Sequence, residues 1–77
     1  MMEIKMPLLS QRLKLLRSEK NVTQQNMAEL LGKTSRHYQD IESGKINIPS
    51  LTLIKLADYF GVSLDYLVGR SEDRRML

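Results

Sequence analysis

The fold is decided by the stretch TQQNMAELLGKTSRHYQDIESGK, residues 23–45. Its apolar residues recur at helical spacing in two short segments, about 24–31 and 35–42. A threonine stands directly before each segment, where its hydroxyl can accept a hydrogen bond from an amide of the first helical turn. Gly32 follows the first segment and suits the left-handed residue that ends many helices. These features predict two short helices joined by a tight turn.

Helical spacing continues on both sides of this stretch. Towards the N-terminus, three leucines at i, i+4 and i+7 predict an amphipathic helix over about 8–20. They are Leu9, Leu13 and Leu16. Towards the C-terminus, residues 45–48 form a loop, and a fourth helix begins at Pro49-Ser50 and ends before Gly61.

A short fifth helix over 64–68, capped by Ser63, completes the pattern. No window alternates between apolar and polar residues for long, so strands are not expected. The sequence therefore predicts an all-α fold, a compact five-helix bundle that forms one domain over residues 8–69. Residues 1–7 and 70–77 are expected to be flexible termini.

Composition excludes several classes of protein. The chain has 77 residues, 42% hydrophobic and 27% charged, which suits one globular domain. It has no cysteine and a single histidine, His37. A disulfide, a thiolate zinc site and a multi-histidine metal site are therefore ruled out within one chain. We expect no metal, no cofactor and no catalytic activity.

The charge balance favours an anionic partner. Twelve lysines and arginines against nine acidic residues give a net charge of +3, and the isoelectric point is near 9.5. Such a basic balance weakly favours a polyanion such as nucleic acid. No apolar run approaches the roughly 18 residues that span a membrane, and the N-terminus lacks a secretory pattern. We therefore expect a cytoplasmic protein with no membrane association.

Two short helices separated by a tight turn at Gly32-Lys33 have the pattern of a helix-turn-helix. With this pattern the sequence resembles the Cro/phage-repressor (Xre-type) helix-turn-helix DNA-binding domain family over about residues 8–73. The resemblance implies a lambda-repressor-like bundle of five helices that binds operator DNA, usually as a dimer. The matching segments are RLKLLRSEK (12–20), TQQNMAELLG (23–32), YQDIESGK (38–45) and LIKLADYFGVSLDYLVGRSED (53–73).

The second helix of the motif has the pattern of a recognition helix, which buries one face and presents the other to the major groove. Tyr38 and Ile41 lie on the face expected to be buried. The opposite face is polar, and the resemblance implies that it reads bases together with the threonine before it. The base-reading residues are then Thr34, Ser35, Arg36, Gln39 and Asp40.

Each of these side chains suits a particular partner. Arg36 can hold guanine O6 and N7 with two hydrogen bonds, and Gln39 can pair with adenine. Asp40 has two alternatives. Its carboxylate can accept a hydrogen bond from cytosine N4, or it can pair with Arg36, four residues earlier on the same helix.

Phosphate contacts are expected beside the recognition helix. Gln24 begins the helix over 24–31, whose N-terminal amides and dipole favour an anion. The expected phosphate-contacting residues are Thr23, Gln24, Lys45 and Asn47. The resemblance also implies a structural salt bridge between Arg17 and Glu42 that orients the recognition helix.

The leading hypothesis is a sequence-specific transcriptional regulator, a repressor of phage, mobile-element or bacterial origin. A homodimer on a palindromic operator would place its two recognition helices about 34 Å apart. The candidates for the dimer surface are Leu64, Tyr66, Leu67, Val68 and the tail. Two alternatives stay open: an antitoxin or restriction-controller protein of the same fold, and a protein-interaction module that has lost DNA binding.

Overall fold

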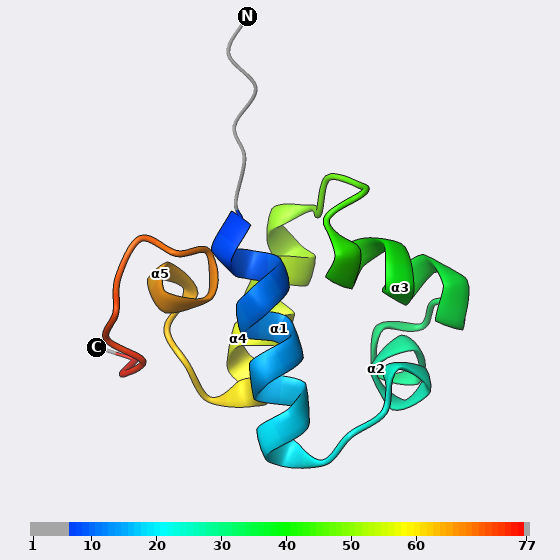
Figure 1. Cartoon of the computed structure of the whole chain (residues 1–77), viewed down its shortest axis with the longest axis horizontal. Helices are drawn as coiled ribbons and strands as arrows, with labels where there is room; N and C mark the ends of the chain where they lie inside the picture. The colour runs from blue at the N-terminus through cyan, green and yellow to red at the C-terminus, as the bar shows by residue number, and fades with distance from the viewer. Residues whose placement is uncertain (1–6, 77) are drawn as a thin grey trace, which may run out of the picture.

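The computed structural model describes residues 7–76, which contain five α-helices and no strand (Figure 1). The all-α prediction with five helices is confirmed for this part of the chain. The helices are α1 (Pro7–Lys20), α2 (Gln24–Leu31), α3 (Ser35–Ser43), α4 (Ser50–Phe60) and α5 (Leu64–Leu67).

The helix ends follow from single residues, as the sequence predicted. The hydroxyl groups of Thr23, Thr34 and Ser63 each accept a hydrogen bond from the third helical amide, at 3.0–3.1 Å. Gly32 and Gly44 adopt the left-handed conformation, with φ of 67° and 83°, and end α2 and α3. Side chains with a Cβ rarely adopt such values, so glycine marks both helix ends.

Three predicted boundaries were wrong by one residue. Helix α1 begins at Pro7 where we expected 8, and a proline is tolerated in the first helical turn. Helix α3 continues to Ser43 where we expected 42, because the left-handed residue that ends it is Gly44. Helix α5 stops at Leu67 where we expected 68, because Val68 has a ψ of 0° and leaves the helical conformation.

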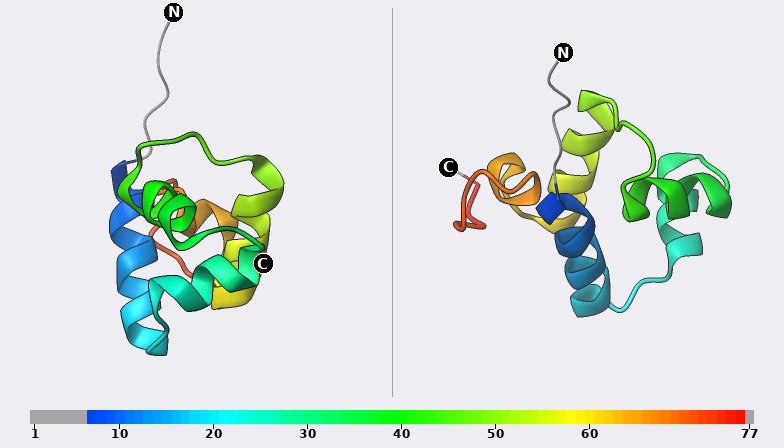
Figure 2. Two further views of the ribbon diagram at one scale, coloured as in Figure 1. Left: turned by 90° about the vertical axis from the view of Figure 1, so that its right-hand side faces the viewer. Right: turned by 45° about the horizontal axis from the view of Figure 1, so that its top comes forward.

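The core is built around α1, which lies between α5 on one side and the α2–α3 pair on the other (Figures 1 and 2). The predicted leucine stripe of α1 faces inward, and Leu13 is fully buried. Helix α2 contributes Met27, α3 contributes Tyr38, and α4 contributes Leu56. Burial of these side chains holds α3 against the bundle by one face only, so its other face stays exposed.

Arg12 ties the C-terminal segment to α1. Its guanidinium donates hydrogen bonds to the carbonyl oxygens of Tyr66 and Ser71, the latter at 2.8 Å. It also pairs with the Glu72 carboxylate at 3.0 Å and stacks over the Tyr66 ring, 4.1 Å from its centre. We expected residues 70–77 to be a flexible terminus, and residues 70–74 are hydrogen-bonded to the bundle.

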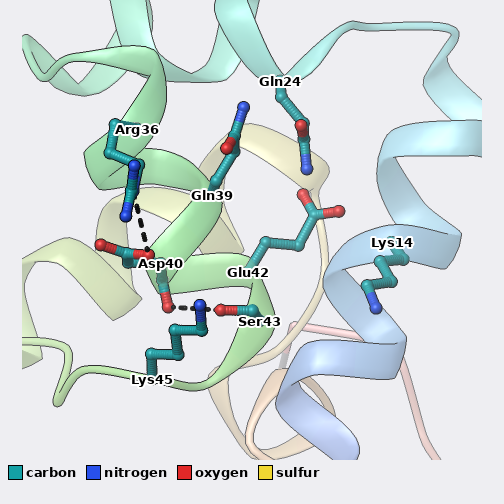
Figure 3. A pocket seen from close by; sticks show the side chains of 8 residues that line it. All are labelled: Lys14, Gln24, Arg36, Gln39, Asp40, Glu42, Ser43 and Lys45. Carbon is teal, nitrogen blue, oxygen red and sulfur yellow. Dashed lines mark hydrogen bonds and ion pairs between the residues drawn. The ribbon is translucent and has the colours of Figure 1, made fainter.

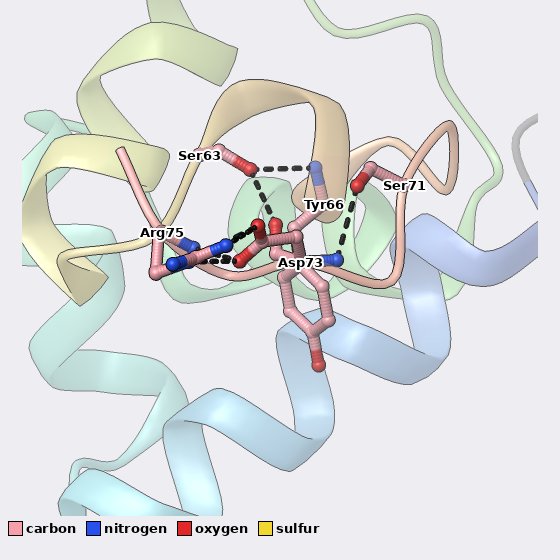
Figure 4. Close-up of polar contacts among 5 residues, drawn as sticks. All are labelled: Ser63, Tyr66, Ser71, Asp73 and Arg75. Atoms are coloured by element: carbon pink, nitrogen blue, oxygen red, sulfur yellow. Dashed lines mark hydrogen bonds and ion pairs between the residues drawn. The ribbon is translucent and has the colours of Figure 1, made fainter. Parts of the chain in front are cut away.

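A second set of polar contacts surrounds Ser63, at the start of α5 (Figure 4). Its hydroxyl donates to the carbonyl oxygen of Asp73 at 3.0 Å while it accepts from the Tyr66 amide. Asp73 in turn receives a hydrogen bond from Arg75 and donates its amide to the Ser71 hydroxyl at 3.0 Å. These bonds join α5 and the segment that follows it into one unit.

This packing corrects the candidate dimer surface. Tyr66 and Leu67, two of the residues expected there, are buried in the core of the chain. The Tyr66 ring packs under Arg12 and near Arg74, whose guanidinium lies 5.1 Å from the ring centre. The side chains of Tyr66 and Leu67 are therefore not accessible to a second molecule, whereas Leu64 is exposed.

Candidate nucleic-acid interface

An open groove of about 520 Å³ lies where α1, α2 and α3 meet (Figure 3). Helix α3 supplies most of its wall, and α1, α2 and the loop after α3 supply the rest. Five of the predicted DNA-contacting residues line it: Gln24, Arg36, Gln39, Asp40 and Lys45. The other lining residues are Lys14, Glu42 and Ser43.

The other four predicted contact residues lie outside this lining. Thr23 and Thr34 cap α2 and α3, and the Thr23 cap is reciprocal because Asn26 accepts from the Thr23 amide at 3.0 Å. Their hydroxyl oxygens are therefore engaged within the chain. Ser35 and Asn47 are exposed at the start of α3 and in the loop after it.

A buried ion pair fixes the inner side of α3. Arg17 of α1 binds the Glu42 carboxylate through two nitrogens, at 3.0 and 3.1 Å. Only 1% of the Glu42 side chain is exposed. Arg17 also donates to the carbonyl oxygen of Val22 at 3.1 Å, and the Glu42 carbonyl accepts from the Ser10 hydroxyl. The structure thus brings the two predicted partners together and couples α3 to both ends of α1.

The Glu42 carboxylate influences its neighbours. Its hydrogen bond raises the pKa of Arg17, which therefore stays cationic. Burial, followed by the nearby carboxylate, raises the pKa of the Tyr38 phenol well above its usual value. The Tyr38 hydroxyl has no hydrogen-bond partner within residues 7–76. The two hydrogen bonds between Arg17 and Glu42, together with the buried Tyr38 ring, make this side of α3 a fixed support.

The outer side of α3 carries a different pair. Arg36 and Asp40 approach each other one turn apart, with the arginine Nε 3.9 Å from the carboxylate Oδ1 (Figure 3). The Arg36 side chain is 82% exposed and the Asp40 side chain 29%. Of the alternatives for Asp40, the free chain shows the pairing with Arg36. Water screens such a contact, so the pair is weak and easily opened.

Two groove residues were missed from the sequence. Lys14 is exposed on α1 and faces the groove from the side opposite α3 (Figure 3). Its spacing of three residues from Arg17 put both cations on one side of the amphipathic helix, a signal that could have found it. Ser43 closes the groove at the end of α3, where its hydroxyl donates to the Asp40 carbonyl at 3.2 Å.

The charges of the groove suit an anion. Lys14, Arg36 and Lys45 contribute three cations, and the Glu42 carboxylate is neutralised by Arg17. Asp40 is the groove-lining carboxylate without such a close partner. Within residues 7–76, no three acidic or histidine side chains converge on a possible metal site. None of the helices in this part of the chain is long and apolar enough to cross a membrane.

Comparison with known proteins agrees with this geometry. Residues 10–70 match the family described as helix-turn-helix domain. Over 68 residues the chain is 41% identical to the uncharacterized HTH-type transcriptional regulator YqaE of Bacillus subtilis (strain 168). Over 61 residues it is 41% identical to the SPbeta prophage-derived uncharacterized HTH-type transcriptional regulator YonR of the same organism. These matches span 87% and 79% of the chain, but only 59% and 56% of the relatives' lengths.

Proposed function

The chain belongs to the helix-turn-helix domain family, and on that premise we propose that it is a DNA-binding transcriptional regulator of the Cro/phage-repressor (Xre) type. The observation that carries the proposal is the groove beside α3. There an exposed arginine and an amide, Arg36 and Gln39, line the same groove as two lysines, Lys14 and Lys45. A duplex offers phosphates to cations and base edges to polar side chains, and this groove presents both kinds of group together. We therefore propose a binding module and not an enzyme.

The proposed contacts divide by chemistry. Arg36 and Gln39 reach base edges in the major groove, because they project from the exposed face of α3. Lys14, across the groove on α1, and Lys45, in the loop after α3, hold phosphates. Gln24, with the N-terminal amides of the eight-residue α2, holds a further phosphate.

We propose that the regulator acts as a homodimer through α4. Its exposed side carries Leu51, Ile54, Lys55 and Asp58, which follow the spacing i, i+3, i+4 and i+7. The Leu51 side chain is 80% exposed. A shallow depression of about 230 Å³ adjoins the exposed side of α4. The residues that line this depression include Ile54, Asp58, Leu64 and Met76.

A second copy of the chain suits this α4 surface. In a two-fold contact the same patch faces itself, so each feature needs its complement within the patch. The α4 surface has a projecting leucine and a depression to receive it, and it has one cation and one anion. None of its residues lines the groove beside α3, so the groove stays free.

The dimer can be tested without DNA. Sedimentation equilibrium is expected to give a dimer for the unchanged protein and a monomer for Leu51→Glu. Leu15→Glu, at an exposed leucine of α1 outside the patch, is the matched control and is expected to stay dimeric. Lys55→Asp and Asp58→Lys should each weaken the dimer, and together they should restore it. A monomer at all concentrations for the unchanged protein would overturn the proposed dimer.

The biological setting follows from this proposal. A dimer would read a palindromic operator, and a bound operator blocks access to a promoter, so we propose a repressor. The prophage origin in the name of one relative supports a phage or mobile-element source. The protein would then act in the cytoplasm of a prokaryotic or phage-infected cell.

Selection of binding sites from random duplex DNA, at two salt concentrations, tests the proposed function. We expect enrichment of a palindrome with half-sites about one helical turn apart. Affinity for the selected site should fall steeply as salt rises, because the lysines displace counterions from the phosphates. No enriched sequence at low salt would reject DNA reading and favour a protein-interaction module.

A further inference from the structure

Asp40 is an acidic side chain on a surface that is proposed to bind a polyanion. It lines the groove together with three cations, and the other lining carboxylate, Glu42, is neutralised by Arg17. A carboxylate at this position repels phosphate at any DNA sequence. If Asp40 only weakened binding to DNA, it would not serve the proposed function. We therefore ask what its contact with Arg36 does.

The geometry of the contact leaves Arg36 free to read a base. Asp40 approaches the guanidinium at Nε, at 3.9 Å, so the two terminal Nη groups stay unoccupied by it (Figure 3). A guanidinium has five N–H donors in a planar fork. Arg36 can therefore keep Asp40 at one edge and hold guanine O6 and N7 with the other.

The contact is also weak enough to be lost. The Arg36 side chain is 82% exposed, and its long, flexible stem can turn to a phosphate on either strand. When it does, Asp40 is left facing DNA without its counter-ion. In a complex on the matched sequence, by contrast, the guanidinium stays between the carboxylate and the base.

From this geometry we infer that Asp40 is a specificity-determining residue that acts through Arg36. It positions the guanidinium for guanine and makes unfavourable every complex in which Arg36 leaves it for a phosphate. Discrimination of this kind comes from repulsion in the wrong complex as much as from attraction in the right one. The inference rests on the proposed DNA-binding function.

The test compares Asp40→Asn with the unchanged protein at one salt concentration, on the selected site and on unrelated duplex DNA. Removing the charge should tighten binding to unrelated DNA about five-fold. Affinity for the selected site should stay the same or fall, so the ratio of the two affinities should drop at least about five-fold. Glu29→Gln is the matched control, since it makes the same charge change on α2 outside the groove lining. It should leave the ratio unchanged.

A second comparison asks whether Asp40 acts through Arg36. Asp40→Asn and Arg36→Ala should weaken the preference at the same base pair. The double variant should lose no more of that preference than Arg36→Ala alone. Equal tightening on both DNAs, no change on either, or a changed preference at a different base pair would overturn the inference. If the unchanged protein selects no site, the proposed function fails instead, so the two failures are distinguishable. A melting curve for each variant confirms that it is folded.

Discussion

Two arginine–carboxylate pairs lie on the inner and outer sides of the same helix, and they differ in nearly every physical respect. Arg17 and Glu42 meet through two short contacts, with the carboxylate only 1% exposed. Arg36 and Asp40 approach at 3.9 Å on a surface where the arginine is 82% exposed. The same chemical groups therefore give a fixed support on one side of α3 and an adjustable contact on the other.

The difference shows that burial, and not the residue types, decides what an ion pair does. A buried charge cannot recover the solvation that it has lost, so removing its partner is costly. An exposed pair exchanges its partner for water at little cost. Helix α3 needs both kinds, because a reading surface must be held from behind while its side chains stay free to choose partners.

The largest expected effect comes from breaking the inner pair. Glu42→Ala leaves Arg17 without its partner and should lower the free energy of unfolding by about 3–5 kcal/mol. The melting temperature should fall by more than about 10 °C, as followed by circular dichroism. Glu29→Ala, at an exposed carboxylate of α2, is the control. Equal melting temperatures for the two variants would contradict the supporting role of the inner pair.

The outer pair should affect DNA affinity and not folding. Arg36→Ala should cost about 1–3 kcal/mol on the selected site and relax the preference at one base pair. Its melting temperature should match that of the unchanged protein, because a surface substitution shifts stability by about 0.5 kcal/mol or less. Fluorescence anisotropy on single-base variants of the site provides the measurement. An unchanged preferred site would mean that Arg36 does not read bases.

A smaller effect, with no sequence preference, is expected at the edge of the groove. Lys45→Ala should weaken binding to every duplex by a similar factor, because a lysine that holds a phosphate reads no base. The slope of the logarithm of affinity against the logarithm of salt concentration should become shallower by about one unit. A loss confined to one sequence would instead make Lys45 a base reader and would move it to the same class as Arg36.

The smallest effect concerns a third pair, which separates geometry from burial. Glu19 and Arg74 meet as closely as the inner pair, at 2.9 and 3.0 Å, but the pair is exposed. The hydrogen bond from Arg74 lowers the pKa of Glu19 below its ordinary value of 4.5. A carboxylate with a lowered pKa stabilises the fold above 4.5, and this contribution disappears as the pH falls through the lowered pKa.

Thermal melts at several pH values test this third pair. Near neutral pH, Glu19→Gln should lower the melting temperature by no more than about 2 °C. The difference from the unchanged protein should vanish in acid, once Glu19 is protonated in both the folded and unfolded states. A loss as large as that of Glu42→Ala would show that close geometry, without burial, is enough to stabilise a pair.

Much of the fold could be predicted from local signals. The capping residues Thr23, Thr34 and Ser63 lie where the helices begin, and Gly32 and Gly44 lie where they end. These signals act over a few residues, so no knowledge of packing is needed to recognise them. The one-residue errors at the ends of α3 and α5 have opposite signs. Helix α3 runs one residue further, up to the residue before Gly44, whereas α5 stops one residue short of the end of its apolar pattern at Val68.

Less of the candidate site could be predicted. Arg36, Gln39 and Asp40 were found because they share the polar face of one helix, and a helix face follows from sequence spacing. Lys14 was missed because its place beside them depends on how α1 packs against α3. The contacts of Arg12 with Ser71 and Glu72 were missed for the same reason, since they join residues about 60 positions apart.

The sequence by itself determined, to within one residue, where each helix starts and stops, and it determined which side of each helix is apolar and which polar side chains α3 presents. These properties depend on backbone conformation and on side-chain spacing, both of which are local. Only the tertiary structure decided that the Glu42 side chain is 1% exposed while that of Asp40, two residues away on the same helix, is 29% exposed. Burial depends on what packs against each side of the helix, so the roles of the two carboxylates were settled by contacts distant in the chain.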